Sequence, residues 1–154
     1  MRTVEASIDI QTTPDVVFDL IHDYGRRLEW DSFLQEACLL DGAERAGLGV
    51  KSRCTARSGF GGLVMETVYV SFERPRVAAV RMTKGPAVLE TFAASLRQDE
   101  AGIGATRVTY RFNFGTRPRF FRAIGDRIAA ALFRREVRQR LRALKEYLER
   151  SAPA

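Results

Sequence analysis

The sequence has very few of the residues that build metal centres, disulfide frameworks or membrane anchors. Its 154 residues include one histidine, His22, and two cysteines, Cys38 and Cys54. A structural zinc site needs about four Cys or His ligands, so a site of that kind is excluded. Two cysteines are too few for a disulfide framework. No apolar run approaches the roughly 20 residues that span a bilayer. We expect no metal and no redox cofactor.

The bulk composition predicts one globular domain. The first residues, Met1 to Glu5, lack the apolar core of a signal peptide, so we expect a cytoplasmic protein whose thiols stay reduced. The chain length fits a single ligand-binding domain over residues 1–150, with 151–154 as a disordered tail. The net charge of +6 is compatible with an anionic partner but does not require one.

The first part of the chain predicts a strand followed by two short helices. Residues 4–10 alternate between apolar and polar and indicate a strand. Thr13-Pro14-Asp15 is typical of a helix start, because Thr13 can cap free N–H groups and Pro14 suits the first turn. A second short helical or irregular piece holds Trp30 and Phe33.

The rest of the chain predicts an antiparallel meander and one long helix. Apolar residues recur every three or four positions from Phe121 to Leu148, which predicts an amphipathic helix near 118–148, bent near Gly125. Turn residues separate six alternating segments before it. These segments are about 36–41, 48–57, 63–73, 76–83, 87–98 and 105–114.

This order and its landmarks resemble the START-related superfamily, which includes the birch-pollen allergen and bacterial polyketide cyclase/dehydrase proteins. The landmarks are residues 12–21, 29–33, 72–76 and 144–149. The resemblance implies an α+β helix-grip fold: a curved seven-stranded antiparallel sheet wrapped around a long C-terminal helix, with two short helices after the first strand. It also implies a cavity between sheet and helix. Members carry lipids, sterols or hormones, and some are cyclases or dehydratases.

Strand parity predicts which side chains face that cavity. In the last strand Tyr110, Phe112 and Phe114 share one face with Val108, and the apolar face should look inward. Hairpin pairing carries this choice backwards, with Tyr110 opposite Ala94, Glu90 opposite Val80, and Cys54 near Thr67. The same parity puts Phe72 outside with Val68 and Val70, which indicates a bulge or another contact surface there.

An apolar wall with a few hydroxyls and one acid is typical of a small-ligand pocket. These aromatic residues could also pack against one another as core. We expect the ligand to contact residues of the strands, the helix pair and the long helix. They are Trp30, Phe33, Cys54, Tyr69, Val80, Met82, Glu90, Phe92, Tyr110, Phe112, Ile124 and Ile128.

Glu90 is the sharpest polar candidate. A carboxylate on an inner face is costly unless it is paired or protonated, so its pKa is expected to rise. It could orient a ligand hydroxyl or act as a general acid or base. The alternative is a salt bridge near the cavity mouth.

The other candidates each have two interpretations. His22 could serve in acid–base chemistry at the cavity mouth, or it could interact with the dipole at the end of the first helix. Trp30 and Phe33 could touch ligand or plug the core.

Cys38 and Cys54 could lie opposite each other in a hairpin, although no neighbouring charge indicates an activated thiol. Residues 59–62 lack the downstream Lys-Ser/Thr of a phosphate loop and are interpreted as a strand connection at the cavity entrance.

The long helix is strongly basic, with eleven Arg and Lys between 117 and 150 against four acidic residues. Such a face could meet anionic lipids or RNA, or could simply be solvated. The aromatic residues do not interleave the arginines in the way that binding of a single nucleic-acid strand requires, which argues against nucleic acid.

The leading hypothesis is a binding or carrier protein for a small hydrophobic or aromatic molecule, either lipid- or polyketide-like. The first alternative is a cyclase/dehydratase-type enzyme that uses Glu90, Tyr110 or His22 for proton transfer. The second is an interaction module that uses the basic helix on RNA or a membrane. The sequence leaves a monomer and a homodimer equally open.

Overall fold

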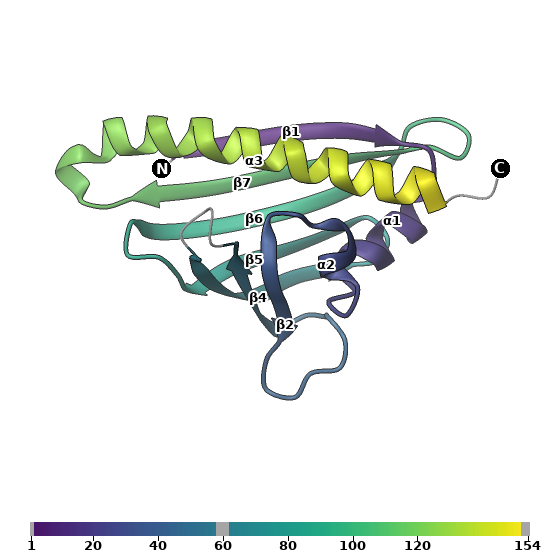
Figure 1. Ribbon diagram of the computed structural model, residues 1–154, viewed down its shortest axis with the longest axis horizontal. Helices are drawn as coiled ribbons and strands as arrows, with labels where there is room; N and C mark the ends of the chain where they lie inside the picture. The colour runs from purple at the N-terminus through teal and green to yellow at the C-terminus, as the bar shows by residue number, and fades with distance from the viewer. Residues whose placement is uncertain (1, 58–61, 152–154) are drawn as a thin grey trace.

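The computed structural model describes residues 2–57 and 62–151. Most of the expected tail at 151–154 and most of the connection at 59–62 lie outside them, whereas Ser151 is the last residue of the final helix rather than part of a tail. Figure 1 labels the elements along the chain. They are β1 (Arg2–Ile10), α1 (Pro14–Ile21), α2 (Arg27–Trp30), β2 (Leu34–Leu39), β3 (Lys51–Ala56), β4 (Val64–Glu73), β5 (Val77–Lys84), β6 (Leu89–Glu100), β7 (Thr106–Thr116), the 3₁₀ turn η2 (Arg119–Phe121) and α3 (Arg122–Ser151).

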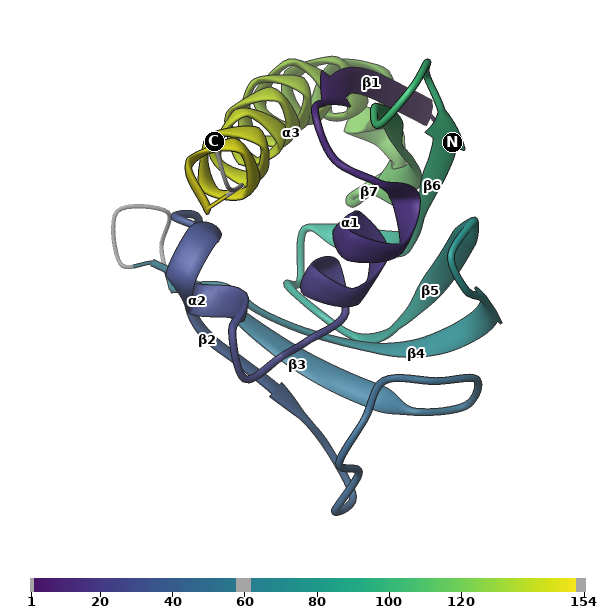
Figure 2. The same cartoon turned by 90° about the vertical axis from the view of Figure 1, so that its right-hand side faces the viewer.

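The strands form one antiparallel seven-stranded sheet in the order β1-β7-β6-β5-β4-β3-β2. Figure 2 shows the sheet curling from β1 round to β2, with α3 along its concave side and α1 and α2 beside it. This is the α+β helix-grip architecture that the sequence predicts. Within the described residues, no helix combines the length and the apolar character needed to cross a membrane.

Helix α1 begins where the sequence predicts, but Thr13 does not act as expected. Thr13 occupies the N-cap position with extended backbone angles, yet its side chain makes no capping hydrogen bond. Pro14 at the first position and Asp15 in the first turn remain as start signals. Packing supplies the remaining stabilisation of the helix, because α1 buries Val17, Phe18, Leu20 and Ile21.

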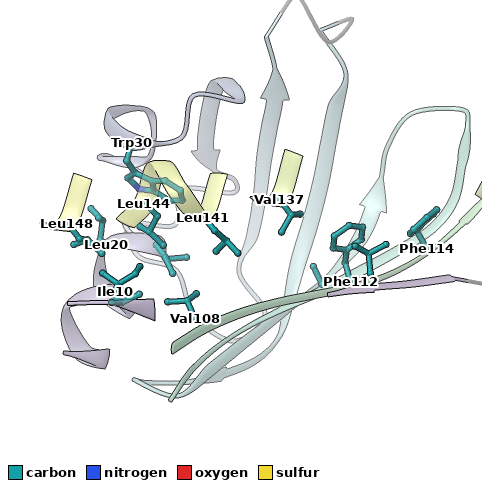
Figure 3. Packing of buried hydrophobic residues seen from close by; sticks show 14 of the residues in the cluster. Ile10, Leu20, Trp30, Val108, Phe112, Phe114, Val137, Leu141, Leu144 and Leu148 are labelled. Atoms are coloured by element: carbon teal, nitrogen blue, oxygen red, sulfur yellow. The ribbon is translucent and has the colours of Figure 1, made fainter. Parts of the chain in front are cut away.

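The two halves of α3 have different environments. In the second half, Val137, Leu141, Leu144 and Leu148 are buried in the main core. Figure 3 shows this cluster, in which they pack with residues of β1, α1, α2 and β7. Burying one such side chain stabilises a fold by about 1.5–3 kcal/mol. In the first half, Ile124, Ile128 and Leu132 stay largely exposed, at 62%, 58% and 60%. The second half therefore anchors the helix.

The start of α3 is tied to the end of β7. The buried carboxylate of Asp126 accepts hydrogen bonds from the backbone N–H of Thr116 at 3.0 Å and from its hydroxyl at 2.6 Å. Gly125 makes this approach feasible, because a Cβ at that position would lie 2.8 Å from Oγ1 of Thr116. The glycine that the sequence associates with a bend thus provides a close helix–strand contact.

The observed hairpin pairings differ from the expected ones. The three pairings named above each differ by an even number of residues, and an even shift preserves the face to which a side chain points. Tyr110, Val80 and Cys54 therefore keep their predicted inner face although the register is wrong. Tyr110 pairs with Leu96 rather than Ala94, Val80 with Ala94 rather than Glu90, and Cys54 with Met65 rather than Thr67.

A β-bulge between Tyr69 and Ser71 explains the apolar residues on the outer face of β4. The extra residue is Val70, which is 49% exposed. Beyond it the parity reverses, so Phe72 turns inward rather than outward. Its ring lies 5.1 Å from that of Phe18 and 5.4 Å from those of His22 and Tyr69. The bulge interpretation of this segment is confirmed.

Candidate functional site

A cavity of about 500 Å³ lies between the concave side of the sheet and α3. Most of its wall is apolar, because strand alternation directs one face of each strand inward. The apolar lining includes Met65, Val80, Phe92, Leu96, Phe112, Phe133 and Val137. The rings of Phe92, Phe112 and Phe133 contact one another at 5.3–6.2 Å, which gives the wall a stiff aromatic part.

Eight of the twelve residues expected to contact ligand line this cavity. They are Phe33, Cys54, Tyr69, Val80, Phe92, Tyr110, Phe112 and Ile128. The other four do not belong to the lining. Trp30 is 8% exposed and belongs to the core, so the interpretation of Trp30 as a plug holds. Met82 packs against the edge of the core, close to Gly85. Ile124 is exposed beside the cavity mouth.

The fourth residue outside the cavity lining is Glu90, and its predicted position on the apolar inner face is wrong. It is the extra residue of a bulge between Leu89 and Thr91, which removes it from the alternating inner face. Its carboxylate accepts hydrogen bonds from Arg119, at 2.7 and 3.1 Å, and from Arg122. The hydrogen bond from Arg119 and the charge of Arg122 lower the pKa of Glu90, whereas the sequence predicts a rise. Glu90 therefore forms the salt bridge that was the alternative interpretation.

One end of the cavity is polar, and His22 is part of it. Nδ1 of His22 lies 2.8 Å from Oη of Tyr69, and that hydroxyl lies 3.2 Å from Oη of Tyr24. Burial and the nearby charge of Arg27 lower the pKa of His22 to about 3, so the ring is neutral at neutral pH. Burial also raises the pKa of Tyr69 above its usual range. A neutral ring gains little from a helix dipole, which argues against the dipole interpretation of His22.

A buried ion triad lies beside these rings. Asp31 is fully buried and accepts hydrogen bonds from Nε of Arg27 at 2.9 Å and from Nη2 of Arg140 at 2.7 Å. Burial alone would raise the pKa of Asp31, but the two guanidinium groups outweigh it and lower that pKa to about 2. Arg27 and Arg140 line the cavity, and each lies over an aromatic ring, Trp30 at 5.1 Å and Phe33 at 5.2 Å. The triad thus brings positive charge to the cavity wall.

Two small hydroxyls and a thiol complete the polar end. Ser52 and Thr67 hydrogen-bond to each other at 2.9 Å across β3 and β4. Cys54 lines the cavity, and burial raises the pKa of its thiol. It pairs with Ala37, whereas Cys38 pairs with Arg53. The two cysteines are free and point to opposite faces of the sheet, so they do not form the facing pair that the sequence left open.

The ion triad was not identified from the sequence, although two features of the sequence indicate it. Arg27 and Asp31 stand four residues apart, the spacing of a helical ion pair. Arg140 lies among Val137, Leu141 and Leu144, within three or four positions of each, on the side of α3 that turns inward. A charge at such a position is a reason to search for a buried partner.

Half-exposed apolar residues form the cavity mouth. Leu63, Val88, Ile128 and Leu132 all line the cavity while leaving 50–60% of their surface exposed. They come from the segment before β4, the connection before β6, and the first half of α3. The mouth therefore opens between the β5–β6 connection and the less anchored half of the helix.

Comparisons with known proteins agree with this architecture. The family model described as "Polyketide cyclase / dehydrase and lipid transport" matches residues 1–149. No curated protein matches the chain. Among solved structures, the Zhui aromatase/cyclase from Streptomyces sp. R1128 is 16% identical with a TM-score of 0.85, over 99% of this chain and 96% of that one.

Two further structures share the fold at low identity. A START superfamily protein from Mycobacterium smegmatis is 10% identical with a TM-score of 0.81, over 97% of this chain and 99% of that one. A protein from Thermus thermophilus is 16% identical with a TM-score of 0.80, over 98% of this chain and 100% of that one. At such identities these structures show the fold alone, and the family model carries the assignment. The chain belongs to the polyketide cyclase/dehydrase and lipid transport family.

Proposed function

We propose that the protein binds or carries a small, mostly apolar molecule of lipid- or polyketide-like character in the cavity between the sheet and α3. The single observation that carries this proposal is the cavity itself. Its volume of about 500 Å³ falls within the range of roughly 300–1,000 Å³ that is usual for small-molecule pockets. Its wall is largely apolar, and a cluster of polar groups that includes Tyr24, Arg27, Tyr69 and Arg140 lies at one end. Such a cavity favours a mostly apolar molecule that carries a polar group at one end.

The polar end supports binding more strongly than proton transfer. Tyr24, Tyr69 and Arg27 offer hydrogen-bond donors to a carbonyl, hydroxyl or carboxylate of the ligand. A general base is most efficient when its pKa lies near the working pH. His22, with a pKa of about 3, is far from that range. These groups therefore fit hydrogen bonding to a bound ligand better than proton transfer.

Native mass spectrometry of the freshly purified protein tests for a retained ligand. A neutral naphthylamine dye, whose fluorescence rises in apolar surroundings, tests the cavity directly. Ala94 lines the cavity, while its neighbour Ala93 pairs with Arg81 and Asn113 on the outer face. Ala94→Phe should reduce dye affinity tenfold or more by filling the cavity, and Ala93→Phe should leave it unchanged. Val80→Phe provides a second filling variant.

Equal dye binding by the wild type, Ala94→Phe and Val80→Phe would remove the cavity as the binding site. Circular dichroism of each variant shows whether the fold is retained. A retained molecule lost from both filling variants, and kept by Ala93→Phe, would support the proposal and identify the ligand class by mass.

The alternative function is a cyclase/dehydratase-type enzyme, and the contact between His22 and Tyr69 favours it. A ligand carbonyl placed against Tyr69 would lie within one hydrogen bond of the His22 ring. Turnover of a chain bearing alternating carbonyls, followed by the absorbance of an aromatic product, tests it. Loss of turnover in His22→Gln and in Tyr69→Phe, with dye binding retained, would establish this second function.

A further inference from the structure

Large apolar side chains surround the cavity mouth on the outside of the molecule. On α3 and η2 these are Phe120, 80% exposed, together with Phe121, Ile124, Ile128 and Leu132, each between 58% and 62% exposed. Across the mouth, Leu63 and Val88 are 50% and 59% exposed. Figure 1 shows the start of α3 and the β5–β6 connection at the same end of the molecule. We call these seven residues the rim surface.

The members on η2 and α3 form a continuous strip. Residues four apart lie above one another on a helix, so Ile124, Ile128 and Leu132 make one row. The row is continued by Phe120 and Phe121, whose ring centroids lie 4.6 Å apart. Isolated exposed apolar residues are ordinary on a protein surface, but a contiguous strip beside a cavity mouth marks a contact surface.

Positive charge flanks this strip. Arg127 follows Ile124 by three positions and Arg135 follows Leu132 by three, so both border the row, and both are exposed. Arg117 and Arg119 lie at its start. Among the described acidic groups near the strip, Glu90 is bonded to Arg119 and Arg122, Asp126 is buried against Thr116, and Glu136 lines the cavity and is partly buried. The exposed charge bordering the strip is therefore mainly positive.

We propose that the rim surface docks on a membrane containing anionic lipids. Apolar side chains of a partly exposed helix enter the boundary between headgroups and acyl chains, and flanking arginines contact phosphates. A second copy of the chain is a weaker fit, because it would bring like charges face to face. A nucleic acid would leave the apolar strip uncovered. In the docked state the cavity mouth faces the lipid. This proposal goes beyond ligand binding, because docking does not depend on what fills the cavity.

Co-sedimentation with vesicles tests the proposal. The probes are vesicles of phosphatidylcholine alone and of phosphatidylcholine mixed with phosphatidylglycerol. We expect wild-type protein to bind the mixed vesicles at least tenfold more tightly, with affinity falling as salt rises. Phe120→Ser/Ile124→Ser removes two strip residues that do not line the cavity, and should lower that affinity tenfold or more. Arg127→Gln/Arg135→Gln should lower it by roughly tenfold as well.

Matched controls distinguish vesicle binding through the rim surface from nonspecific hydrophobic or electrostatic binding. Leu48→Ser/Ile103→Ser removes two exposed apolar residues from loops away from the mouth. Arg81→Gln/Arg97→Gln removes two exposed arginines from the outer face of β5 and β6. Both controls should bind the mixed vesicles like wild type. Failure of the wild type to bind them, or equal losses in the controls and the rim variants, would overturn the proposal.

Sedimentation velocity supplies a further outcome. If the wild type is a dimer that Phe120→Ser/Ile124→Ser converts to a monomer, and no vesicle binding is seen, the strip belongs to a second copy and the membrane proposal is overturned. Dye binding in the cavity should be the same in Phe120→Ser/Ile124→Ser as in the wild type. Vesicle docking and ligand binding can therefore fail independently of each other.

Discussion

Nη2 of Arg140 lies 2.7 Å from Oδ2 of Asp31, and this ion pair joins the long helix α3 to the end of the short helix α2. Arg27 binds the same carboxylate from within α2 at 2.9 Å. Asp31 therefore neutralises part of the charge of two buried guanidinium groups and holds two elements around the polar end of the cavity.

Replacing Asp31 by Asn should destabilise the fold strongly. The change keeps the shape but leaves Arg27 and Arg140 without a counter-charge, a situation that costs about 3–5 kcal/mol. The free energy of unfolding in urea measures the effect. Asp19→Asn is the matched control, since Asp19 pairs with Arg74 at 2.7 Å on the surface, where such a pair contributes at most about 1 kcal/mol. Similar losses in the two variants would contradict a structural role for the triad.

Asp31 should also make the fold sensitive to acid. Its pKa is about 2 in the folded protein against an ordinary 3.8, so the folded state binds a proton less readily than the unfolded chain. The stabilisation is complete above pH 3.8 and disappears as the pH falls towards 2, amounting to roughly 2–3 kcal/mol. Unfolding measured across this range should show a steeper loss in the wild type than in Asp31→Asn. Parallel curves would exclude Asp31 as the cause.

His22 should remain neutral well below its ordinary pKa of 6.5. Because His22 is the only histidine, its ring signals in an NMR titration are unambiguous. They should stay constant from neutral pH down to about pH 5, since the folded pKa is about 3. The unfolded chain takes up this proton below about pH 6.5, so stability should decline as the pH falls from there, by up to about 1.4 kcal/mol per pH unit.

The decline should be absent in His22→Gln, which cannot take up the proton. A ring that titrates near its ordinary pKa in the folded protein would show that His22 is solvated, and the proposed polar end of the cavity would then lose its central member.

Gly125→Ala should destabilise the protein although alanine favours helix formation by about 1 kcal/mol. The added Cβ would meet Oγ1 of Thr116 at 2.8 Å and disturb its hydrogen bond to Asp126. We expect a net loss of about 1–2 kcal/mol in the free energy of unfolding. The control is Ala131→Gly on the exposed side of the same helix, which should cost about 1 kcal/mol from helix propensity alone. A gain of stability in Gly125→Ala would show that α3 does not need this close approach.

Cys54 should react slowly with a neutral thiol reagent in the folded protein. Burial raises the pKa of its thiol, so the reactive thiolate is scarce, and the approach to it is through the cavity. In Cys38→Ser protein, labelling should be at least tenfold slower than in denaturant, and slower again when the naphthylamine dye fills the cavity. Labelling that the dye leaves unchanged would place Cys54 outside the dye-binding space.

Strand alternation was enough to predict most of the cavity wall. Phe92, Tyr110 and Phe112 were assigned to it from parity, and parity survives a pairing error of two or four residues. The bulge at Val70 left a trace in the sequence, because strict alternation placed three apolar residues, Val68, Val70 and Phe72, together on the outer face of β4. The bulge at Glu90 left no such trace in the sequence. A single extra residue near the start of a strand disturbs no repeating pattern, so Glu90 was assigned to the wrong environment.

Strand parity could not predict the polar end of the cavity. Asp31 ends a four-residue helix, and such a short element has no periodicity from which to infer burial. Its partner Arg140 is 109 residues away, and only the docking of α3 on α2 brings the two together. The apolar stripe of α3 was predicted as one feature. The structure divides it into a half that is buried in the core and a first half in which Ile124, Ile128 and Leu132 stay exposed at the cavity mouth.

The open cavity has a thermodynamic consequence for the folded chain. Its apolar wall is accessible to water through the mouth in the folded state, so unfolding exposes less new apolar surface than in a filled domain of equal length. The heat capacity of unfolding should therefore fall below the roughly 2 kcal/mol/K typical of 154 residues, which flattens the stability curve with temperature. A molecule that fills the cavity would dehydrate the wall and raise that heat capacity, so the empty and filled proteins would differ in the temperature dependence of their stability as well as in its magnitude.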